Sequence, residues 1–189
     1  MRVTGGKLGG RRLVAPENQL VRPTSDRTRQ AIFNILEHRD FGMGFTVENA
    51  AVADIYAGTG ALGIEALSRG ARFCLLVDND AGSRALQREN VEALSLTGAT
   101  KIWRRDATDL GPLGAGAGSP FDLVFLDPPY RKDLVAPALK SLREGGWLSP
   151  HALLVIETAK GETFAQDGYT QLELRNYGDT DIVFLTTAK

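Results

Sequence analysis

The stretch DIYAGTGALG, residues 54–63, decides the fold. It begins inside the apolar run Val52–Ile55, which is typical of a buried strand, and it ends inside the helical pattern of Ala61–Arg69. Its three glycines have the spacing G-x-G-x-x-G, and Asp78 ends the next predicted strand twenty positions after the first of them. A strand, a glycine loop, a helix and an acid in this order predict a site for a nucleoside-bearing cofactor.

The same alternation of strand and helix continues along the chain. Apolar runs predict strands at 52–55, 73–78, 100–104, 121–126 and 152–157. Helical patterns lie between them at 61–69, 81–94 and 134–144. This order predicts an α/β fold with a Rossmann-like, doubly wound, mostly parallel sheet. The end of the chain differs, because residues 169–175 and 182–187 are joined through a turn and predict an antiparallel hairpin.

A second motif, Asp127-Pro128-Pro129-Tyr130, directly follows the apolar run Phe121–Leu126. Ligands of open α/β sheets bind just past the carboxyl ends of the strands, and the motif falls there. Two prolines fix φ and donate no backbone hydrogen bond, so they end the strand and hold the backbone stiff. The carboxylate before them can accept hydrogen bonds from an amino group while the ring after them stacks on the plane that carries it. The structural alternative is a strand-ending acid, a proline turn and a core tyrosine.

Two acids favour S-adenosylmethionine over NAD, although both cofactors carry adenosine. Asp54 precedes the glycines, where a carboxylate suits a methionine ammonium group better than a pyrophosphate. Asp106-Ala107 follows the third strand, where it can reach the adenine edge, although Asp106 can also be a helix cap. The carboxylate of Asp78 can accept hydrogen bonds from ribose hydroxyls. Glycines let backbone N–H groups approach a ligand, although packing alone can explain Gly63. The expected cofactor-binding residues are Asp54, Tyr56, Ala57, Gly58, Gly60, Leu62, Asp78, Asn79, Asp106 and Ala107.

The overall composition fits one soluble domain with a small extension. The chain has 189 residues, 43% hydrophobic and 24% charged. No apolar stretch approaches the ~18 residues of a membrane span, and the N-terminus has no apolar signal core, so we expect a cytoplasmic protein. The single cysteine, Cys74, lies in an apolar run and is expected to be buried and inert. Together with His38 and His151 it shows no ligand spacing, so we expect no metal.

Charge is unevenly distributed along the chain. Residues 1–39 carry eight Lys and Arg against three Asp and Glu, whereas residues 40–189 carry 14 against 20. A basic N-terminal extension (residues 1–40) on an acidic body (residues 41–189) favours an anionic partner, although a solvated basic face is the alternative.

Two parts of this extension can approach phosphates. Short strands at 2–4 and 11–14 flank a glycine-rich turn that permits close approach to the main chain. A helix then starts near residues 22–25, capped by Thr24 or Ser25. Cations near a helix N-terminus oppose its macrodipole, which favours a phosphate-contact role for them. The expected phosphate-contact residues are Lys7, Arg11, Arg12, Arg22, Thr24, Arg27 and Arg29.

The glycine loop and the motif at 127–130 together resemble those of class I S-adenosylmethionine-dependent methyltransferases that act on an exocyclic nitrogen. Three segments narrow the resemblance: TGGKLGGRRL at 4–13, RPTSDRTR at 22–29, and residues 54–69. In combination they resemble the bacterial 16S rRNA guanine-N2 methyltransferases of the RsmD type, over nearly the whole chain.

This resemblance implies a sheet of seven strands with a reversed last strand, and a guanine of the assembled 30S subunit as the substrate. It also implies that Asp78 holds the ribose, that Asp106 and Ala107 face the adenine, and that the phosphate-contact residues of the basic extension bind RNA. Independently of the resemblance, we expect a monomer. In direct methyl transfer, the Asp127 carboxylate and the Pro128 carbonyl orient the guanine amino group. Family members often have Glu at position 78 and Phe at position 130, and the Gly-rich loop 111–120 looks like an insertion without an assigned role.

Three other functions remain open from the residues alone. A DNA adenine-N6 or cytosine-N4 methyltransferase uses the same tetrapeptide, but the chain has no evident target-recognition domain. An NAD-dependent dehydrogenase fits the glycines and leaves the tetrapeptide and the basic extension unexplained. A non-catalytic RNA-binding module fits the extension but needs neither motif. The identity and position of the modified base come from the resemblance alone.

Overall fold

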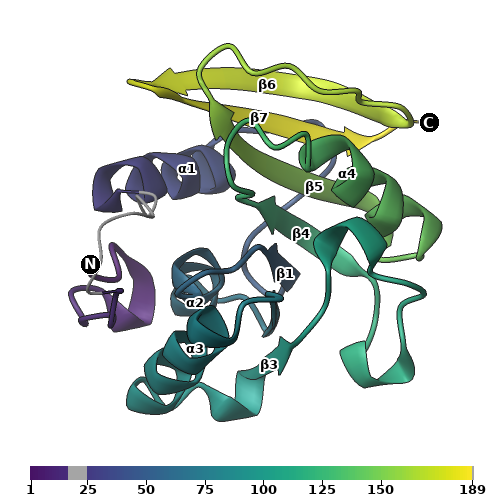
Figure 1. The fold of residues 1–189 in the computed structure, drawn as a ribbon. Helices are drawn as coiled ribbons and strands as arrows, with labels where there is room; N and C mark the ends of the chain where they lie inside the picture. Colours follow the sequence, from purple (N-terminus) through teal and green to yellow (C-terminus); the bar gives the residue numbers. More distant parts are fainter. Residues whose placement is uncertain (17–24, 189) are drawn as a thin grey trace.

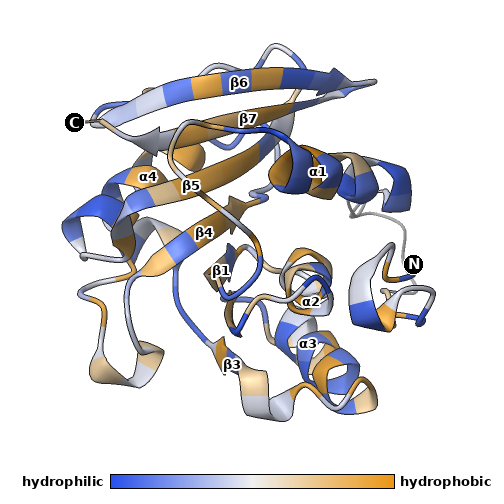
Figure 2. Ribbon diagram, turned by 180° about the vertical axis from the view of Figure 1, so that it is seen from behind, coloured by the Kyte–Doolittle hydropathy of each residue, from blue (hydrophilic) through white to orange (hydrophobic). Residues whose placement is uncertain are grey.

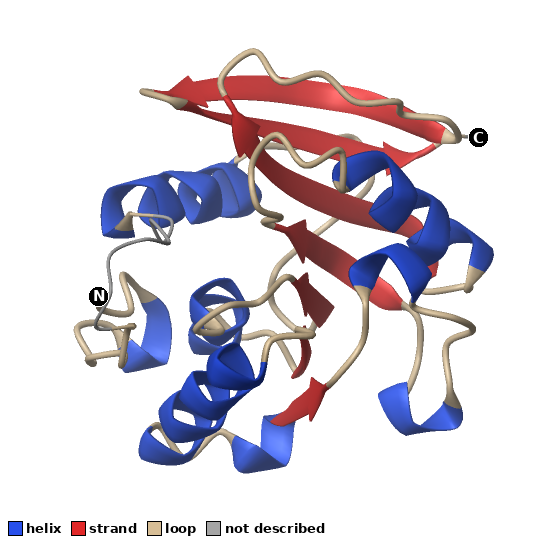
Figure 3. Ribbon diagram, viewed as in Figure 1, coloured by secondary structure: helices blue, strands red, loops and turns tan. Residues whose placement is uncertain are grey.

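A mixed sheet forms the centre of the molecule (Figures 1 and 3). The computed structural model describes residues 1–16 and 25–188, and within these residues the sheet has seven strands in the order β3-β2-β1-β4-β5-β7-β6. The strands are β1 (Ala51–Ile55), β2 (Phe73–Val77), β3 (Thr100–Trp103), β4 (Phe121–Leu126), β5 (Leu148–Ala159), β6 (Tyr169–Tyr177) and β7 (Thr180–Thr187). Strands β1 to β5 pair in parallel, and β7 pairs antiparallel with both β5 and β6. The predicted mostly parallel sheet with a terminal hairpin is confirmed.

Helices cover both faces of this sheet because its strands are apolar on both sides. Along β1, Val52 belongs to the buried cluster that includes side chains of α1, α2 and α3, whereas Ala51 and Ala53 belong to the cluster that includes side chains of α4. The helices are α1 (Asp26–His38), α2 (Ala61–Ser68), α3 (Ala81–Ala93) and α4 (Val135–Glu144). In Figure 2 the central strands β4, β5 and β7 are mainly hydrophobic, whereas the outer strand β6 alternates. The outer strand is accordingly exposed along much of its length.

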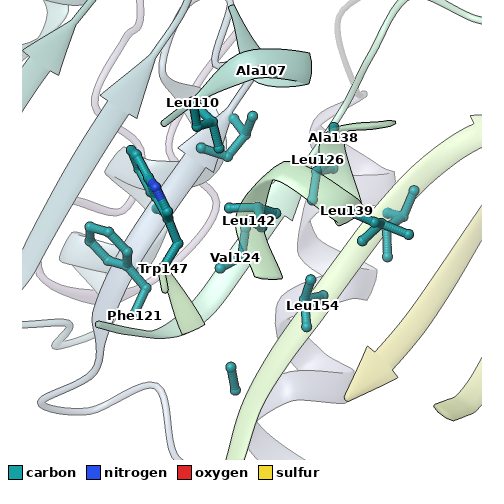
Figure 4. Close-up of a cluster of buried hydrophobic side chains, with 14 of the residues drawn as sticks. Ala107, Leu110, Phe121, Val124, Leu126, Ala138, Leu139, Leu142, Trp147 and Leu154 are labelled. Atoms are coloured by element: carbon teal, nitrogen blue, oxygen red, sulfur yellow. The ribbon is translucent and has the colours of Figure 1, made fainter. Parts of the chain in front are cut away.

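Trp147 is the largest fully buried side chain and organises the core under α4 (Figure 4). Its ring stacks on Phe121 at 5.9 Å between centroids and meets the edge of Trp103 at 6.1 Å. Its indole Nε1 donates a hydrogen bond of 2.8 Å to the carbonyl of Gly111. The Gly-rich loop 111–120 is therefore fixed at its start to this core, and it contains the short 3-10 helix η4 (Ala115–Ala117).

The N-terminal segment, residues 1–14, pairs antiparallel where two short strands were predicted, although the pairing is limited to one bridge between Arg2 and Arg12. The glycine-rich turn between these residues contains a 3-10 helix, η1 (Gly6–Leu8). The following helix α1 is capped by Ser25, whose side chain accepts a hydrogen bond of 3.1 Å from the Thr28 N–H. The other predicted cap, Thr24, lies outside the described residues.

A buried ion-pair network joins this segment and α1 to α2. Arg29 is fully buried, and its guanidinium contacts Asp26 at 2.7 Å and Glu65 at 3.3 Å. Glu65 also accepts hydrogen bonds of 2.9 Å from Arg69 and 2.8 Å from the Thr4 N–H. This burial corrects the expectation that Arg29 contacts RNA, because its charge is used inside the fold and is not presented at the surface.

We expect the substitution Glu65→Ala to lower the free energy of unfolding by about 3–5 kcal/mol, because it leaves the buried Arg29 without this partner. Urea denaturation measures the loss. The control is Glu144→Ala, which removes an exposed pair with Lys140 at 3.9 Å and should cost less than about 1 kcal/mol. Equal losses from the two substitutions would contradict a structural role for the network.

Candidate active site at the carboxyl edge of the sheet

Four loops meet where the parallel strands β1 to β4 end. The end of β4 joins that of β1 through a hydrogen bond of 3.3 Å from the Asp127 N–H to the Ile55 carbonyl. The Ala57 N–H reaches the Val77 carbonyl at 3.1 Å, and the Asp78 N–H reaches the Trp103 carbonyl at 3.2 Å. The structure therefore brings the predicted cofactor loop, both acids and the tetrapeptide to one edge, at the point where the strand order reverses.

The glycine loop after β1 is open at one glycine and closely packed at another. Gly58 has φ +53°, and a Cβ there would meet no atom within 4 Å, so its backbone is accessible to a ligand. A Cβ at Gly63 would lie 2.5 Å from the Cys74 sulfur and 2.7 Å from Leu76. Packing therefore explains Gly63, while the turn and the open backbone explain Gly58.

Asp54 lies beneath this loop, 1% exposed, and accepts a hydrogen bond of 2.9 Å from the Gly63 N–H. Burial raises the pKa of its carboxyl to about 8; the Gly63 hydrogen bond opposes this rise, and the charge of Asp78 adds to it. A positively charged ligand group beside Asp54 would favour the ionised form. The buried Cys74 thiol, close to the same helix, also has a pKa raised by burial.

The two predicted acids have partners within the loops. Asp78 accepts hydrogen bonds of 2.9 Å from the N–H groups of Gly58 and Asp80, one on each carboxylate oxygen. Asp106 is exposed and caps the 3-10 helix η3 (Ala107–Asp109) through Thr108, whose hydrogen bonds lower the pKa of the Asp106 carboxyl. The helix-cap role considered for Asp106 is thus present in the structure.

Tyr56 lies close to both acids. Its φ is +60°, uncommon for a residue with a side chain. Its hydroxyl is buried and has no hydrogen-bond partner among the described residues. Burial, followed by the charges of Asp106 and Asp78, raises the pKa of this hydroxyl to about 12. A buried donor without a partner is costly, so this hydroxyl is available to a ligand at the edge.

The tetrapeptide presents its ring to solvent and anchors it at the hydroxyl. Tyr130 is 38% exposed, which excludes a core tyrosine. Its hydroxyl donates a hydrogen bond of 2.6 Å to Glu157, at the end of β5, and lies 3.0 Å from the Thr180 hydroxyl in β7. Burial of the hydroxyl and the bond to Glu157 raise its pKa. Sequence analysis did not include Glu157, although it is an acid ending a predicted strand, the signal that identified Asp78.

Two groups of exposed basic side chains bear on the predicted nucleic-acid contacts. Of the residues predicted in the N-terminal extension, Lys7, Arg11, Arg12 and Arg27 are exposed, whereas Arg22 lies outside the described residues. At the carboxyl edge of the sheet, a second group of exposed cations follows β3 and the tetrapeptide: Arg104, Arg105, Arg131 and Lys132. Sequence analysis missed the second group, although Arg104 and Arg105 lie at the end of a predicted strand and Arg131 and Lys132 directly follow the tetrapeptide.

Within residues 1–16 and 25–188, no three His, Cys, Asp or Glu side chains are grouped so that they could hold a metal ion. Among the helices of this same part of the chain, none is long and apolar enough to cross a membrane.

The strand order, the reversed β7 and the glycine loop after β1 define the class I methyltransferase fold. A family model described as Conserved hypothetical protein 95 matches residues 1–186, and the chain belongs to this family. The chain is 34% identical over 158 residues to Ribosomal RNA small subunit methyltransferase D of Escherichia coli K12, covering 84% of this chain and 74% of the relative. It is 30% identical over 181 residues to the protein of the same name from Haemophilus influenzae, covering 94% and 89%. The predicted family resemblance is confirmed.

Solved structures agree over the full length. The structure of Escherichia coli yhhF has a TM-score of 0.79 at 26% identity and covers 100% of this chain and 98% of that chain. A hypothetical protein from Thermus thermophilus has a TM-score of 0.73 at 28% identity and covers 97% and 98%.

The raised pKa of Asp54 predicts a pH-dependent stability. An aspartate in an unfolded chain has a pKa near 3.9, so between about pH 4 and pH 8 the folded protein holds a proton that the unfolded chain has lost. The stability contributed by the neutral carboxyl is therefore lost as the pH rises through this window, by at most about 1.4 kcal/mol per pH unit. Asp54→Asn should remove this slope.

Urea denaturation of both proteins from pH 5 to pH 9, without ligand, measures the difference between their free energies of unfolding. We expect wild type to lose stability relative to Asp54→Asn as the pH rises. A difference that does not change with pH would show that Asp54 is ionised throughout.

Proposed function

We propose that this protein transfers a methyl group from S-adenosylmethionine to the exocyclic N2 of one guanine in small-subunit (16S) rRNA, with the assembled 30S subunit as its substrate. The main support is the contact between the ends of β4 and β1, where the Asp127 N–H lies 3.3 Å from the Ile55 carbonyl. This contact supports a site for a planar amino group beside the proposed cofactor loop. The names of the curated relatives, which are rRNA small-subunit methyltransferases, support RNA as the substrate.

The residues at the edge fit the proposed cofactor. The open backbone at Gly58 allows close approach. The two oxygens of Asp78 each accept one hydrogen bond from the chain, and a carboxylate has about four acceptor positions, so ribose hydroxyls can be added. Asp106 and Ala107 would flank the adenine, and Asp54 would face the ammonium group. Tyr56, Ala57, Gly60, Leu62 and Asn79 would complete the site.

Bound S-adenosylmethionine supplies a methyl group on a sulfonium, which is a strong leaving group. The chain then has mainly to position the acceptor. In the proposed mechanism the Asp127 carboxylate and the Pro128 carbonyl accept hydrogen bonds from the guanine amino group, which turns the nitrogen lone pair toward the methyl. Pro129 keeps this backbone stiff. The proton released from the nitrogen passes to Asp127 or to water.

Tyr130 would stack on the guanine, which has to be turned out of its helix or loop to be reached. Its hydrogen bonds to Glu157 and Thr180 hold the ring from β5 and β7, so stacking costs little further ordering. The acceptor base would therefore meet a fixed aromatic face.

RNA backbone contacts would come from the N-terminal extension (residues 1–40), and methyl transfer from the body (residues 41–189), in a protein acting as a monomer. The proposed contacts are the exposed side chains of Lys7, Arg11, Arg12 and Arg27. The predicted Arg22 and Thr24 remain part of this proposal, and Arg29 does not. Arg131 and Lys132, exposed directly after the tetrapeptide, would hold phosphates near the flipped base.

We expect a tritium-labelled methyl group of S-adenosylmethionine to enter N2-methylguanosine when unmethylated 30S subunits are the substrate. Naked 16S rRNA and duplex DNA serve as parallel substrates, and digestion to nucleosides identifies the product. Label in DNA amino groups would support methyl transfer to an exocyclic nitrogen but would reject rRNA as the substrate. Cofactor binding without transfer to any of the three would reject the proposed reaction.

Asp127→Ala should lower the transfer rate by about 10²–10³-fold, because it removes an acceptor that positions the amino group. Asp127→Asn, which retains a carbonyl oxygen as acceptor, should keep more activity than Asp127→Ala. S-adenosylhomocysteine binding, measured by calorimetry, should stay near the wild-type value in both variants. An Asp127→Ala protein with wild-type rates would overturn the proposed role.

If Arg12 contacts a phosphate, Arg12→Ala should reduce the slope of log K against log salt for 30S binding by about one unit. Lys140→Ala is the control, since Lys140 is an exposed cation on α4. It should leave the slope unchanged, and neither variant should alter cofactor binding. Equal slopes in all three proteins would exclude Arg12 from the interface.

A further inference from the structure

The end of the N-terminal segment is attached to helix α3 through one buried amide. Asn90 is 1% exposed. Its Oδ1 accepts a hydrogen bond of 2.7 Å from the Val14 N–H, and its Nδ2 donates one of 3.1 Å to the Val14 carbonyl. The side chain thus pairs with both backbone groups of Val14, as a neighbouring strand would.

The same amide also holds the cofactor loop. Asn90 Nδ2 donates a second hydrogen bond, of 3.0 Å, to the carbonyl of Thr59, between the two glycines of the loop. The Thr59 hydroxyl in turn lies 3.6 Å from the sulfur of Met1. The hydroxyl of Thr59 is therefore linked to the N-terminal segment directly, and its carbonyl is linked through Asn90.

The arrangement has one chemical solution. The amide oxygen has to face the single N–H donor, and the NH₂ group has to face the two carbonyls, so only asparagine satisfies all three contacts at this length. One turn earlier on α3, the Gln87 amide donates a hydrogen bond of 3.0 Å to the Gly58 carbonyl, and its oxygen has no partner among the described residues. Gly58 is held on its other side by Asp78.

We propose that Asn90 is a positioning residue that couples methyl-donor binding at the glycine loop to RNA binding by the N-terminal extension. This inference rests on the proposed function. A bound methyl donor that contacts Gly58 and Gly60 fixes the position of the Thr59 carbonyl, to which Asn90 is bonded. Asn90 then favours the position of Val14 in which the N-terminal extension lies against α3. Linkage requires the reverse effect to be equal, so bound RNA tightens donor binding by the same factor.

The test measures binding of fluorescently labelled protein to unmethylated 30S subunits, with and without saturating S-adenosylhomocysteine. For wild type we expect the dissociation constant to fall at least about 5-fold when S-adenosylhomocysteine is present, the lower range of allosteric coupling. Asn90→Ala should bring the ratio close to one. Gln87→Ala is the matched control, because it removes a bond to the loop from the same helix and should weaken S-adenosylhomocysteine binding while keeping the ratio.

A second variant addresses loss of folding in Asn90→Ala. Val14→Pro removes the N–H that Asn90 binds and leaves α3 unchanged, so it should also reduce the ratio. A wild-type ratio of one, an unchanged ratio in both variants, or an equal loss in Gln87→Ala would each overturn the coupling. Methyl transfer measured in parallel separates the two proposals: transfer with a wild-type ratio of one rejects the coupling alone, and a retained ratio without transfer rejects only the reaction.

Discussion

The parallel pairing of β1 with β4 determines where the glycine loop lies relative to the proposed catalytic tetrapeptide. Ile55 pairs with Leu126, so the glycine loop and the tetrapeptide leave the sheet at the same level and side by side. Because side chains alternate along a strand, a shift of one residue would turn Asp54 away from α2 and move Asp127 out of register with the loop. The apolar residues of β1 and β4 oppose such a shift because the two faces of the sheet belong to different buried clusters. One cluster includes side chains of α4, and the other includes side chains of α1, α2 and α3.

Two buried carboxylates show how the fold handles charge in different ways. Glu65 is fully buried and meets two guanidinium groups as well as a backbone donor, so it holds the N-terminal segment on α2 as part of an ion network. Asp54 is almost equally buried and accepts one hydrogen bond, from the Gly63 N–H, and burial raises its pKa to about 8. The charge of Glu65 is balanced by cations within the fold, whereas burial favours the neutral form of Asp54 unless a positively charged group binds beside it. The structural carboxylate of Glu65 therefore differs from the candidate-site carboxylate of Asp54 in having its positively charged partners within the chain.

Sequence patterns predicted those features that depend on neighbours in the chain. The glycine loop, the proline tetrapeptide and the alternation of strands and helices each follow from local spacing, and the bounds of these elements were predicted with small errors at their ends. The order of the strands across the sheet was not predicted. The burial of Arg29 depends on Glu65, 36 positions away, and the anchoring of Tyr130 depends on Glu157 and Thr180, 27 and 50 positions away. Such contacts have no local periodicity. The predicted N-terminal strands do pair antiparallel, but only at the Arg2–Arg12 bridge, and the glycine-rich turn between them contains a 3-10 helix.

The N-terminal segment lies against α2 and α3 at one side of the molecule, far from β6 (Figure 1). This segment is part of residues 1–39, which have a net positive charge because they contain eight Lys and Arg against three Asp and Glu. The rest of the chain has a net negative charge, with 14 against 20. A molecule with opposite charges on its two parts has an electric dipole. In the field of a polyanion it rotates before contact, so more of its collisions begin at the basic side and the association rate falls as ionic strength rises. Docking of the segment thus sets the orientation of approach as well as the contacts made on arrival.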